Sequence, residues 1–173
     1  MAGEIKNMLD KATDAVGGTV GKMSAAATKT ADSFVENAAI GDMYEIAAAR
    51  LALRRSGSER VRQMARMMIA DHTTSTHHLK AALEMNETRG VPSPPTEPDT
   101  RRQTMLQHLQ DAPDDAFDST YLDQQVLAHE ETVSLMRSYG EGGDNPQLRS
   151  VALGTLPVVE RHLSHVKQLR TEI

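Results

Sequence analysis

Four long segments of this chain share one pattern, an apolar stripe at helical spacing that a single ionisable residue interrupts. The four segments span residues 31–55, 58–89, 114–139 and 146–171. The interrupting residues are, in order, Glu45, His72, His129 and His162. Apolar residues that recur every three or four positions predict amphipathic helices, and a buried ionisable group is costly unless it is paired or binds a metal ion. The pattern therefore predicts an all-α, four-helix bundle with one polar site near its middle.

The composition supports an all-α fold. The chain has two Phe, three Tyr, no Trp and ten Met, so Ala, Leu, Met and Val must build the interior. These residues favour helices, and runs of β-branched residues with period two, which would indicate strands, are missing. The chain also has no Cys, which excludes disulfides, thiolate nucleophiles and iron–sulfur clusters.

The connections between the predicted helices leave the topology open. A Pro-rich stretch at 91–100 cannot be helical, although a short helix near 99–110 can follow it. The connection between the second and third long helices is roughly 24 residues, which is long for a compact domain. It can climb the length of the bundle, as in ferritin-like folds, or fold back locally to give an up-down-up-down bundle. Pro157 is expected to kink or divide the last helix.

Residues 1–29 form a separate region in this interpretation, preceding a bundle at 30–173. Apolar residues at helical spacing predict a weak amphipathic helix, and Gly17, Gly18 and Gly21 then predict a flexible joint. This arm can be a mobile tail, a contact with a second copy or a protein partner, or a helix at a membrane surface. The sequence leaves these three alternatives open.

Charge and hydropathy limit the partners and the location. The net charge of −5 argues against general nucleic-acid binding. No stretch is apolar for long enough to span a bilayer, and the first residues lack the apolar run of a secretory signal. We therefore expect a cytoplasmic protein without a transmembrane segment.

The interrupting residues suit metal binding. Neutral imidazoles and a carboxylate are ligands for Zn²⁺, Fe²⁺ or Mn²⁺, so we expect Glu45, His72, His129 and His162 to hold one divalent ion. A metal-free hydrogen-bonded core is the alternative. No Glu is followed by His three positions later, which argues against a di-iron centre. Side chains expected to orient the ligands are Asp71, Asp118, Tyr121, Gln125 and His165, the last also an alternate ligand.

Three functions fit these residues. The chain can be a metal-binding protein without turnover, an enzyme that uses the metal for redox or hydrolytic chemistry, or a helical interaction module whose polar core fixes helix register. The sequence identifies no catalytic residue, so it leaves enzymatic activity undecided.

Four stretches of the chain resemble one bacterial family. The stretches are GDMYEIAAARLAL, MARMMIADHTTSTHHLK, AFDSTYLDQQVLAHEETVSL and TLPVVERHL. Over roughly 33–170 they resemble Domain of Unknown Function 4142, a resemblance that implies a ferritin-like four-helix fold and an association with stress. Its motif maps onto Glu45, Asp71, His72, Phe117, Asp118, Tyr121, His129, Leu156, Pro157 and His162. Many members look exported, whereas this chain carries the 1–29 arm in place of a signal.

Overall fold

A computed structural model describes residues 2–173, which form an all-helical protein without a strand in that range. The all-α prediction is therefore confirmed. The elements are α1 (Ala2–Ala27), α2 (Ala31–Arg55), α3 (Glu59–Leu83), the 3₁₀ turn η1 (Asn86–Thr88), α4 (Thr100–Asp111), α5 (Asp114–Gly142) and α6 (Pro146–Arg170). No helix within residues 2–173 combines the length and hydropathy that crossing a membrane would require.

Side-chain caps explain where the helices begin. The side chains of Thr30 and Ser58 accept hydrogen bonds from backbone N–H groups in the first turns of α2 and α3. Asn145 caps α6 in the same way, and Pro146 follows it at the first helical position, where its missing N–H costs nothing. These starts lie within one residue of the predicted ones.

Two details of the predicted helices are wrong. The helix α3 ends at Leu83 rather than near 89, because the hydroxyl of Thr88 donates to the Ala82 carbonyl and stabilises the turn that follows. The helix α6 is not divided at Pro157. Pro157 and Leu153, whose carbonyl loses its helical partner, are both exposed, so water can hydrogen-bond to that carbonyl.

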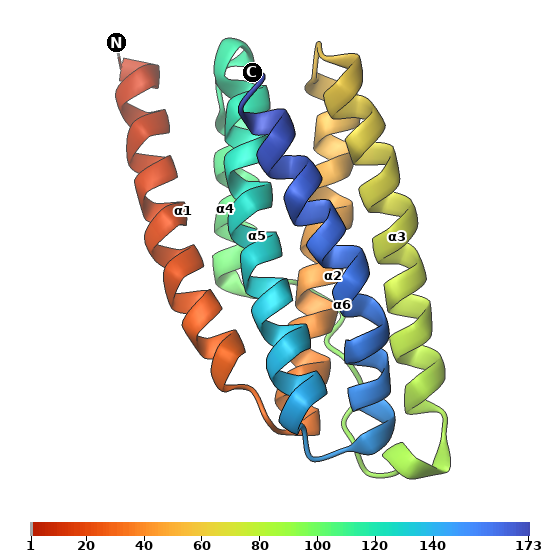
Figure 1. Cartoon of the computed structure of the whole chain (residues 1–173). Coiled ribbons are helices and arrows are strands. Elements are labelled where there is room, and N and C mark those ends of the chain that lie inside the picture. The colour runs from red at the N-terminus through yellow and green to blue at the C-terminus, as the bar shows by residue number, and fades with distance from the viewer. Residues whose placement is uncertain (1) are drawn as a thin grey trace.

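The helices α2, α3, α5 and α6 pack side by side (Figure 1). The helix α2 contacts α3 and α5, and α6 also contacts α3 and α5, so the four form a closed ring. The helices α1 and α4 lie outside this ring and contact α5. Figure 1 also shows that α3 and α5 run in the same direction, because residues 84–113 climb back along the helices between them. Of the two predicted connections, the one that climbs the length of the helices is observed.

Arg55 forms hydrogen bonds to the end of the long connection between α3 and α5. Its guanidinium donates to the Ala112 carbonyl over 2.8 Å and to the Asp114 carboxylate over 2.6 Å. The C-terminus of α2 is thereby tied to the N-terminus of α5. This pair also places an acidic residue from the start of α5 against an arginine at the end of α2.

The apolar core consists of two clusters along the helices. One contains Met68 and Val166, and the other contains Leu79 and Val159. His72 lies between the two clusters along α3, and His162 lies between them along α6. The polar residues of the interior therefore occupy a layer between two apolar ends.

The helix α1 differs from its prediction. It runs without a break through Gly17, Gly18 and Gly21, so the expected flexible joint is wrong. A Cβ at Gly18 would lie 3.0 Å from the Leu127 side chain, and one at Gly21 would lie 2.2 Å from a Glu131 carboxylate oxygen. These glycines allow α1 to approach α5 closely rather than interrupting the helix.

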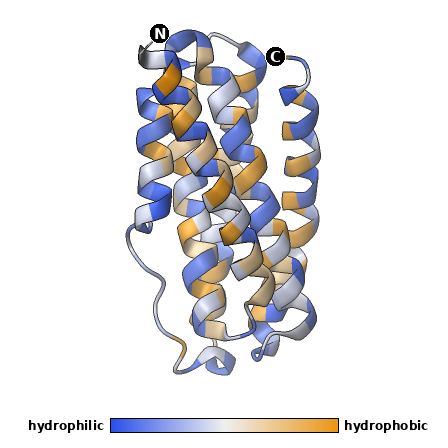
Figure 2. Cartoon of the chain, turned by 90° about the vertical axis from the view of Figure 1, so that its left-hand side faces the viewer, coloured by the Kyte–Doolittle hydropathy of each residue, from blue (hydrophilic) through white to orange (hydrophobic). Residues whose placement is uncertain are grey.

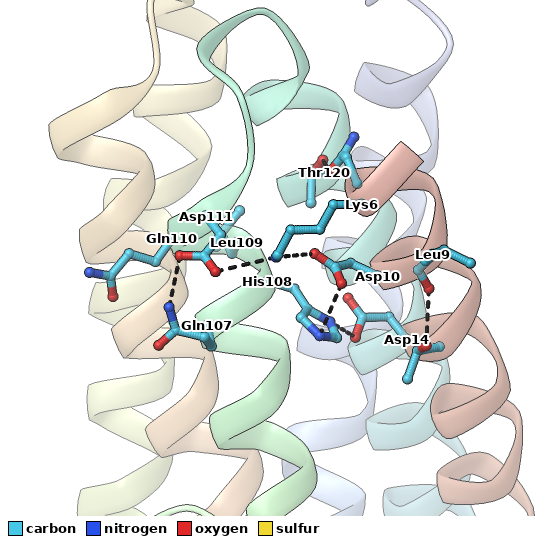
Figure 3. Close-up of polar contacts among 12 residues, drawn as sticks. Lys6, Leu9, Asp10, Asp14, Gln107, His108, Leu109, Gln110, Asp111 and Thr120 are labelled. Carbon is cyan, nitrogen blue, oxygen red and sulfur yellow. Dashed lines mark hydrogen bonds and ion pairs between the residues drawn. The ribbon is translucent and has the colours of Figure 1, made fainter. Parts of the chain in front are cut away.

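Polar contacts hold α1 against α4 and α5 (Figure 3). The buried Asp14 carboxylate lies 2.8 Å from Nδ1 of His108 and accepts a 2.7 Å hydrogen bond from the Gln124 amide. Lys6 forms ion pairs with Asp10 of its own helix and with Asp111 of α4. The polar face of α1 is therefore the face that points inward.

The opposite face of α1 is apolar and exposed. Its large exposed residues are Ile5, Met8, Leu9, Val16, Val20 and Met23. Figure 2 views the molecule from the α1 side and shows apolar residues recurring along the helix nearest the viewer. The helix α1 is thus amphipathic, as predicted, with its apolar face turned to solvent.

Candidate metal centre

Three imidazoles from three helices converge in the polar layer. His72 of α3, His129 of α5 and His162 of α6 each offer one nitrogen, and these nitrogens all lie within 4.8 Å of one another. The ring centroids are separated by 5.5–5.7 Å, and the residues are 4%, 0% and 1% exposed. The structure therefore brings together three of the four predicted ligands in a buried cluster.

Each imidazole is fixed by an acceptor at one nitrogen. Nδ1 of His72 lies 2.8 Å from the Asp42 carboxylate, and Nε2 of His162 lies 2.8 Å from the Asp71 carboxylate. Nδ1 of His129 lies 2.9 Å from the Gln125 backbone carbonyl. An acceptor at one ring nitrogen keeps the proton there, so the lone pair of a neutral ring is on the other nitrogen.

The other nitrogen of each ring is buried without a partner. Nε2 of His72, Nε2 of His129 and Nδ1 of His162 have no hydrogen-bond partner among residues 2–173. Leaving a buried polar atom unpaired costs about 1–3 kcal/mol. Three such atoms on converging rings form a donor set that fits a transition-metal ion and explains why the unpaired atoms are tolerated.

Burial keeps two of the rings neutral. It lowers the pKa of His129 to about 3, with the nearby charge of His72 acting in the same direction. Burial also lowers the pKa of His162 to about 4, against the opposing effect of the hydrogen bond to Asp71. Both rings are uncharged near neutral pH, as metal binding requires.

His72 differs from the other two rings. Burial disfavours its charged form, but the hydrogen bond to Asp42 and the charge of Glu45 outweigh burial and raise its pKa above the ordinary value. A metal ion would therefore compete with a proton at this ring more than at the other two.

Glu45 lies beside the three-imidazole cluster. Its Oε2 accepts a 2.6 Å hydrogen bond from the Gln125 amide, and its Oε1 is 3.5 Å from Nδ1 of His129. Like the three imidazole nitrogens, Oε1 is buried without a hydrogen-bond partner among the described residues. Burial raises the pKa of Glu45. Its role as a fourth ligand stays a prediction.

The predicted supporting residues have different positions. Asp71 and Gln125 contact the rings as described above, and the Tyr121 hydroxyl is buried without a hydrogen-bond partner in the described range. Burial and the charge of Glu45 raise the pKa of Tyr121 well above its ordinary value. One oxygen of the half-buried Asp118 is also unpaired. His165 is exposed, so the structure does not bring it to the centre.

Sequence reasoning missed Asp42, which anchors His72. It is buried on α2, one turn before Glu45, and also accepts a 3.1 Å hydrogen bond from the Thr76 hydroxyl. The spacing of three residues was the available signal, because it puts Asp42 near Glu45 on the helix surface. An isolated acidic residue on a helix is usually solvated, so the signal was weak.

The fold and the centre together define a class: an all-helical protein in which three buried histidines could hold a metal ion. Residues 18–169 match the family described as Domain of unknown function (DUF4142), and the chain belongs to this family. The match begins within α1 and extends almost to the end of α6.

A solved structure has a similar fold. The chain resembles CopM in the Cu(II)-bound form, with a TM-score of 0.69 and 19% sequence identity. The similarity covers 84% of this chain and 99% of that chain. At this identity it shows the fold alone. No curated protein matches the chain.

Proposed function

We propose that this protein binds one transition-metal ion through His72, His129 and His162. The observation that carries the proposal is the trio of buried, unpaired imidazole nitrogens, each on a ring whose other nitrogen is fixed by an acceptor. A purely structural hydrogen-bonded core would pair these nitrogens with one another or with other groups. In this proposal the protein holds the ion without turnover.

We place the site in a ferritin-like four-helix bundle formed by α2, α3, α5 and α6. The ring of contacts among these helices and the connection that climbs from α3 to α5 support this architecture. The link to stress and the cytoplasmic location remain predictions.

Copper is the ion we propose first. A set of imidazole nitrogens without thiolate binds Cu²⁺ more tightly than Zn²⁺, Fe²⁺ or Mn²⁺ in the usual order of affinities. CopM, which has a similar fold, is described in a Cu(II)-bound form. Zn²⁺, Fe²⁺ and Mn²⁺, the ions expected from the sequence, are the alternatives.

Metal analysis of purified, untagged protein tests the proposal. Samples are loaded with each ion, freed of excess metal on a desalting column and analysed for their elements. We expect one equivalent of copper in the wild type and much less in His129→Leu and His162→Leu. His108→Leu is the matched control, because His108 is paired with Asp14 outside the centre. Equal copper in all four proteins would overturn the site.

A substitution of Glu45 tests whether this carboxylate is a fourth ligand. If Glu45 is a fourth ligand, Glu45→Gln weakens metal binding although the three imidazoles remain. If the three imidazoles suffice, Glu45→Gln retains the full equivalent. Electron paramagnetic resonance of the Cu²⁺ protein separates these cases, since the loss of an oxygen ligand changes the spectrum.

We also propose, as a second function, that α1 docks a second copy of this chain. The specific observation is its row of exposed apolar side chains, which includes Leu9 and Val16. Such a face on each copy is complementary to itself in a twofold dimer. Light scattering during gel filtration should show a dimer for the wild type and a monomer for Leu9→Lys/Val16→Lys. Leu153→Lys, an exposed apolar residue on α6, is the control. A monomeric wild type would exclude this role.

A further inference from the structure

A cavity of about 400 Å³ lies between α3 and α6, next to the metal centre. Its wall includes His72 and His162, two of the three proposed ligands, and Asp71, which anchors His162. A volume of a few hundred Å³ is in the range of small-molecule sites. The cavity therefore places a small molecule beside two of the rings that would hold the ion, whose unpaired nitrogens are themselves buried in the metal-free structure.

The polar groups of this wall include several acceptors, beside Ser75, His78 and Gln147, which can also donate. The hydroxyls of Thr74, Ser150 and Thr155 donate to carbonyls of their own helices over 2.9–3.2 Å, which leaves their lone pairs for a ligand. Asp71 adds a carboxylate, and the described residues that line the cavity include no Lys or Arg. Apart from the bound ion itself, the wall therefore offers no fixed cation to a ligand.

Apolar side chains complete the wall. Val151, Val158 and Val159 line the part of the cavity that α6 contributes. A site with an apolar wall and a few acceptors selects compact molecules that carry N–H or O–H donors. Water, ammonia, hydrogen peroxide and imidazole belong to this chemical class.

We propose that this cavity is the binding site for a small neutral molecule that coordinates the metal. Such a molecule supplies a lone pair to the ion and donates an N–H or O–H to the acceptors of the wall. Three imidazoles leave at least one coordination position open, which is the arrangement that distinguishes reactive metal sites from closed structural ones. The inference rests on the proposed metal site and adds to the bound ion a ligand that does not come from the protein.

Gly154 provides a way to close the cavity without changing the three ligands. It lies in α6 on the cavity wall, and no heavy atom comes within 4 Å of the position that a Cβ would take. Its φ is not positive, so a side chain is compatible with the backbone. Phe at this position extends into the open space and should block the route to His72 and His162.

The test is a titration of the Cu²⁺-loaded protein with imidazole at about pH 8, where imidazole is neutral. We expect a saturable change in the visible absorption and in the electron paramagnetic resonance spectrum. Gly154→Phe should weaken imidazole binding by about tenfold or more, with its copper content unchanged. Gly3→Phe is the matched control, because Gly3 is also helical with open space about its Cβ.

Two results would overturn the inference. These are equal imidazole affinity in Gly154→Phe and the wild type, and no spectral change in the wild type. Copper content measured in the same samples separates a failure of the metal site, which would be absent in the wild type, from a failure of the cavity alone. If Gly154→Phe does not fold, Ser150→Phe closes the same cavity from another position on α6. With Zn²⁺ as the bound ion, Co²⁺ substitution gives an equivalent optical signal.

Discussion

At the scale of single residues, the centre depends on which nitrogen of each histidine faces the ion. Asp42 and Asp71 determine this for His72 and His162, and the Gln125 carbonyl determines it for His129. Because the two carboxylates come from α2 and α3, the orientation of the rings requires the assembled fold. The residues that support the ligands should therefore affect metal affinity nearly as strongly as the ligands.

The first prediction concerns Asp71. Replacing it with Ala frees Nε2 of His162, so the ring loses its fixed orientation and part of its basicity. We expect the dissociation constant for copper to rise by about 10–100-fold. Competition with a chromogenic chelator measures this constant. Glu160→Ala, an exposed acidic residue on α6, is the control, and an unchanged constant in Asp71→Ala would show that this carboxylate does not support the site.

The second prediction concerns pH and the metal-free protein. The folded-state pKa of His129 is about 3 and that of His162 about 4, both below the ordinary value near 6.5. As pH falls below that value, the unfolded chain takes up protons that these folded rings do not, so the free energy of unfolding falls. The loss should continue to about pH 4–3 and then level off.

His72 opposes this trend in part, because its raised pKa favours the protonated folded state. Asp42, Asp71, Glu45 and Arg102 are the charged groups that contribute to the pKa values of these three rings. Urea unfolding at a series of pH values measures the effect. His129→Leu should flatten the curve, and a wild-type stability that is constant over the whole range would contradict the two lowered pKa values.

The sequence predicted the histidines better than it predicted their neighbours. A buried histidine on an apolar stripe can be recognised from the sequence alone, because the helical period assigns its position to the interior. The contact of His72 with Asp42 depends on how α2 packs against α3, which no local pattern encodes. Glu45 lies beside the histidines, as its place on the apolar stripe suggested, and its role as a ligand stays a prediction.

At the scale of helices, α1 shows that the structural role of a glycine depends on the residues that it packs against. Clustered glycines usually weaken a helix, and they were interpreted here as a joint. In the structure they form part of the face that packs on α5, where larger residues would not fit. The starts of α3 and α6 were predictable because their caps, Ser58 and Asn145, are local, whereas the packing of α1 depends on residues more than a hundred positions away.

The third prediction concerns Gly21. Its Cβ in Gly21→Ala would overlap the carboxylate of Glu131, which Arg101 and Arg102 hold in ion pairs. We expect a loss of about 1–3 kcal/mol in the free energy of unfolding, although Ala is the better helix former. Faster hydrogen exchange confined to α1 would locate the effect. Gly3→Ala has open space about its Cβ and serves as the control, and an equally stable Gly21→Ala would mean that α1 does not pack as described.

At the scale of the whole molecule, a polar layer separates two apolar clusters. Each cluster draws residues from several helices, and the three histidines lie between them. The all-helical architecture was predictable from the periodic segments. The climbing connection was not, because the length of the segment between α3 and α5 is compatible with both topologies.

The fourth prediction concerns melting with and without metal. A ligand that binds only the folded state adds about 2.7 kcal/mol at a concentration of 100 times its dissociation constant. For a chain of this size we expect copper to raise the melting temperature by about 5–10 °C. Differential scanning calorimetry measures the shift. His162→Leu should melt at the same temperature with and without copper, and a full shift in this variant would place the ion elsewhere.

The three histidines lie on three different helices, α3, α5 and α6. An ion bound to all of them would cross-link the three helices, because none of these helices could separate from the core without breaking a bond between the metal and its histidine. Local opening, which exposes a folded chain to proteases, would then be slower in the loaded protein than in the empty one. The lifetime of the molecule would follow the supply of metal, so the abundance of this protein in a cell would record how much metal that cell has available.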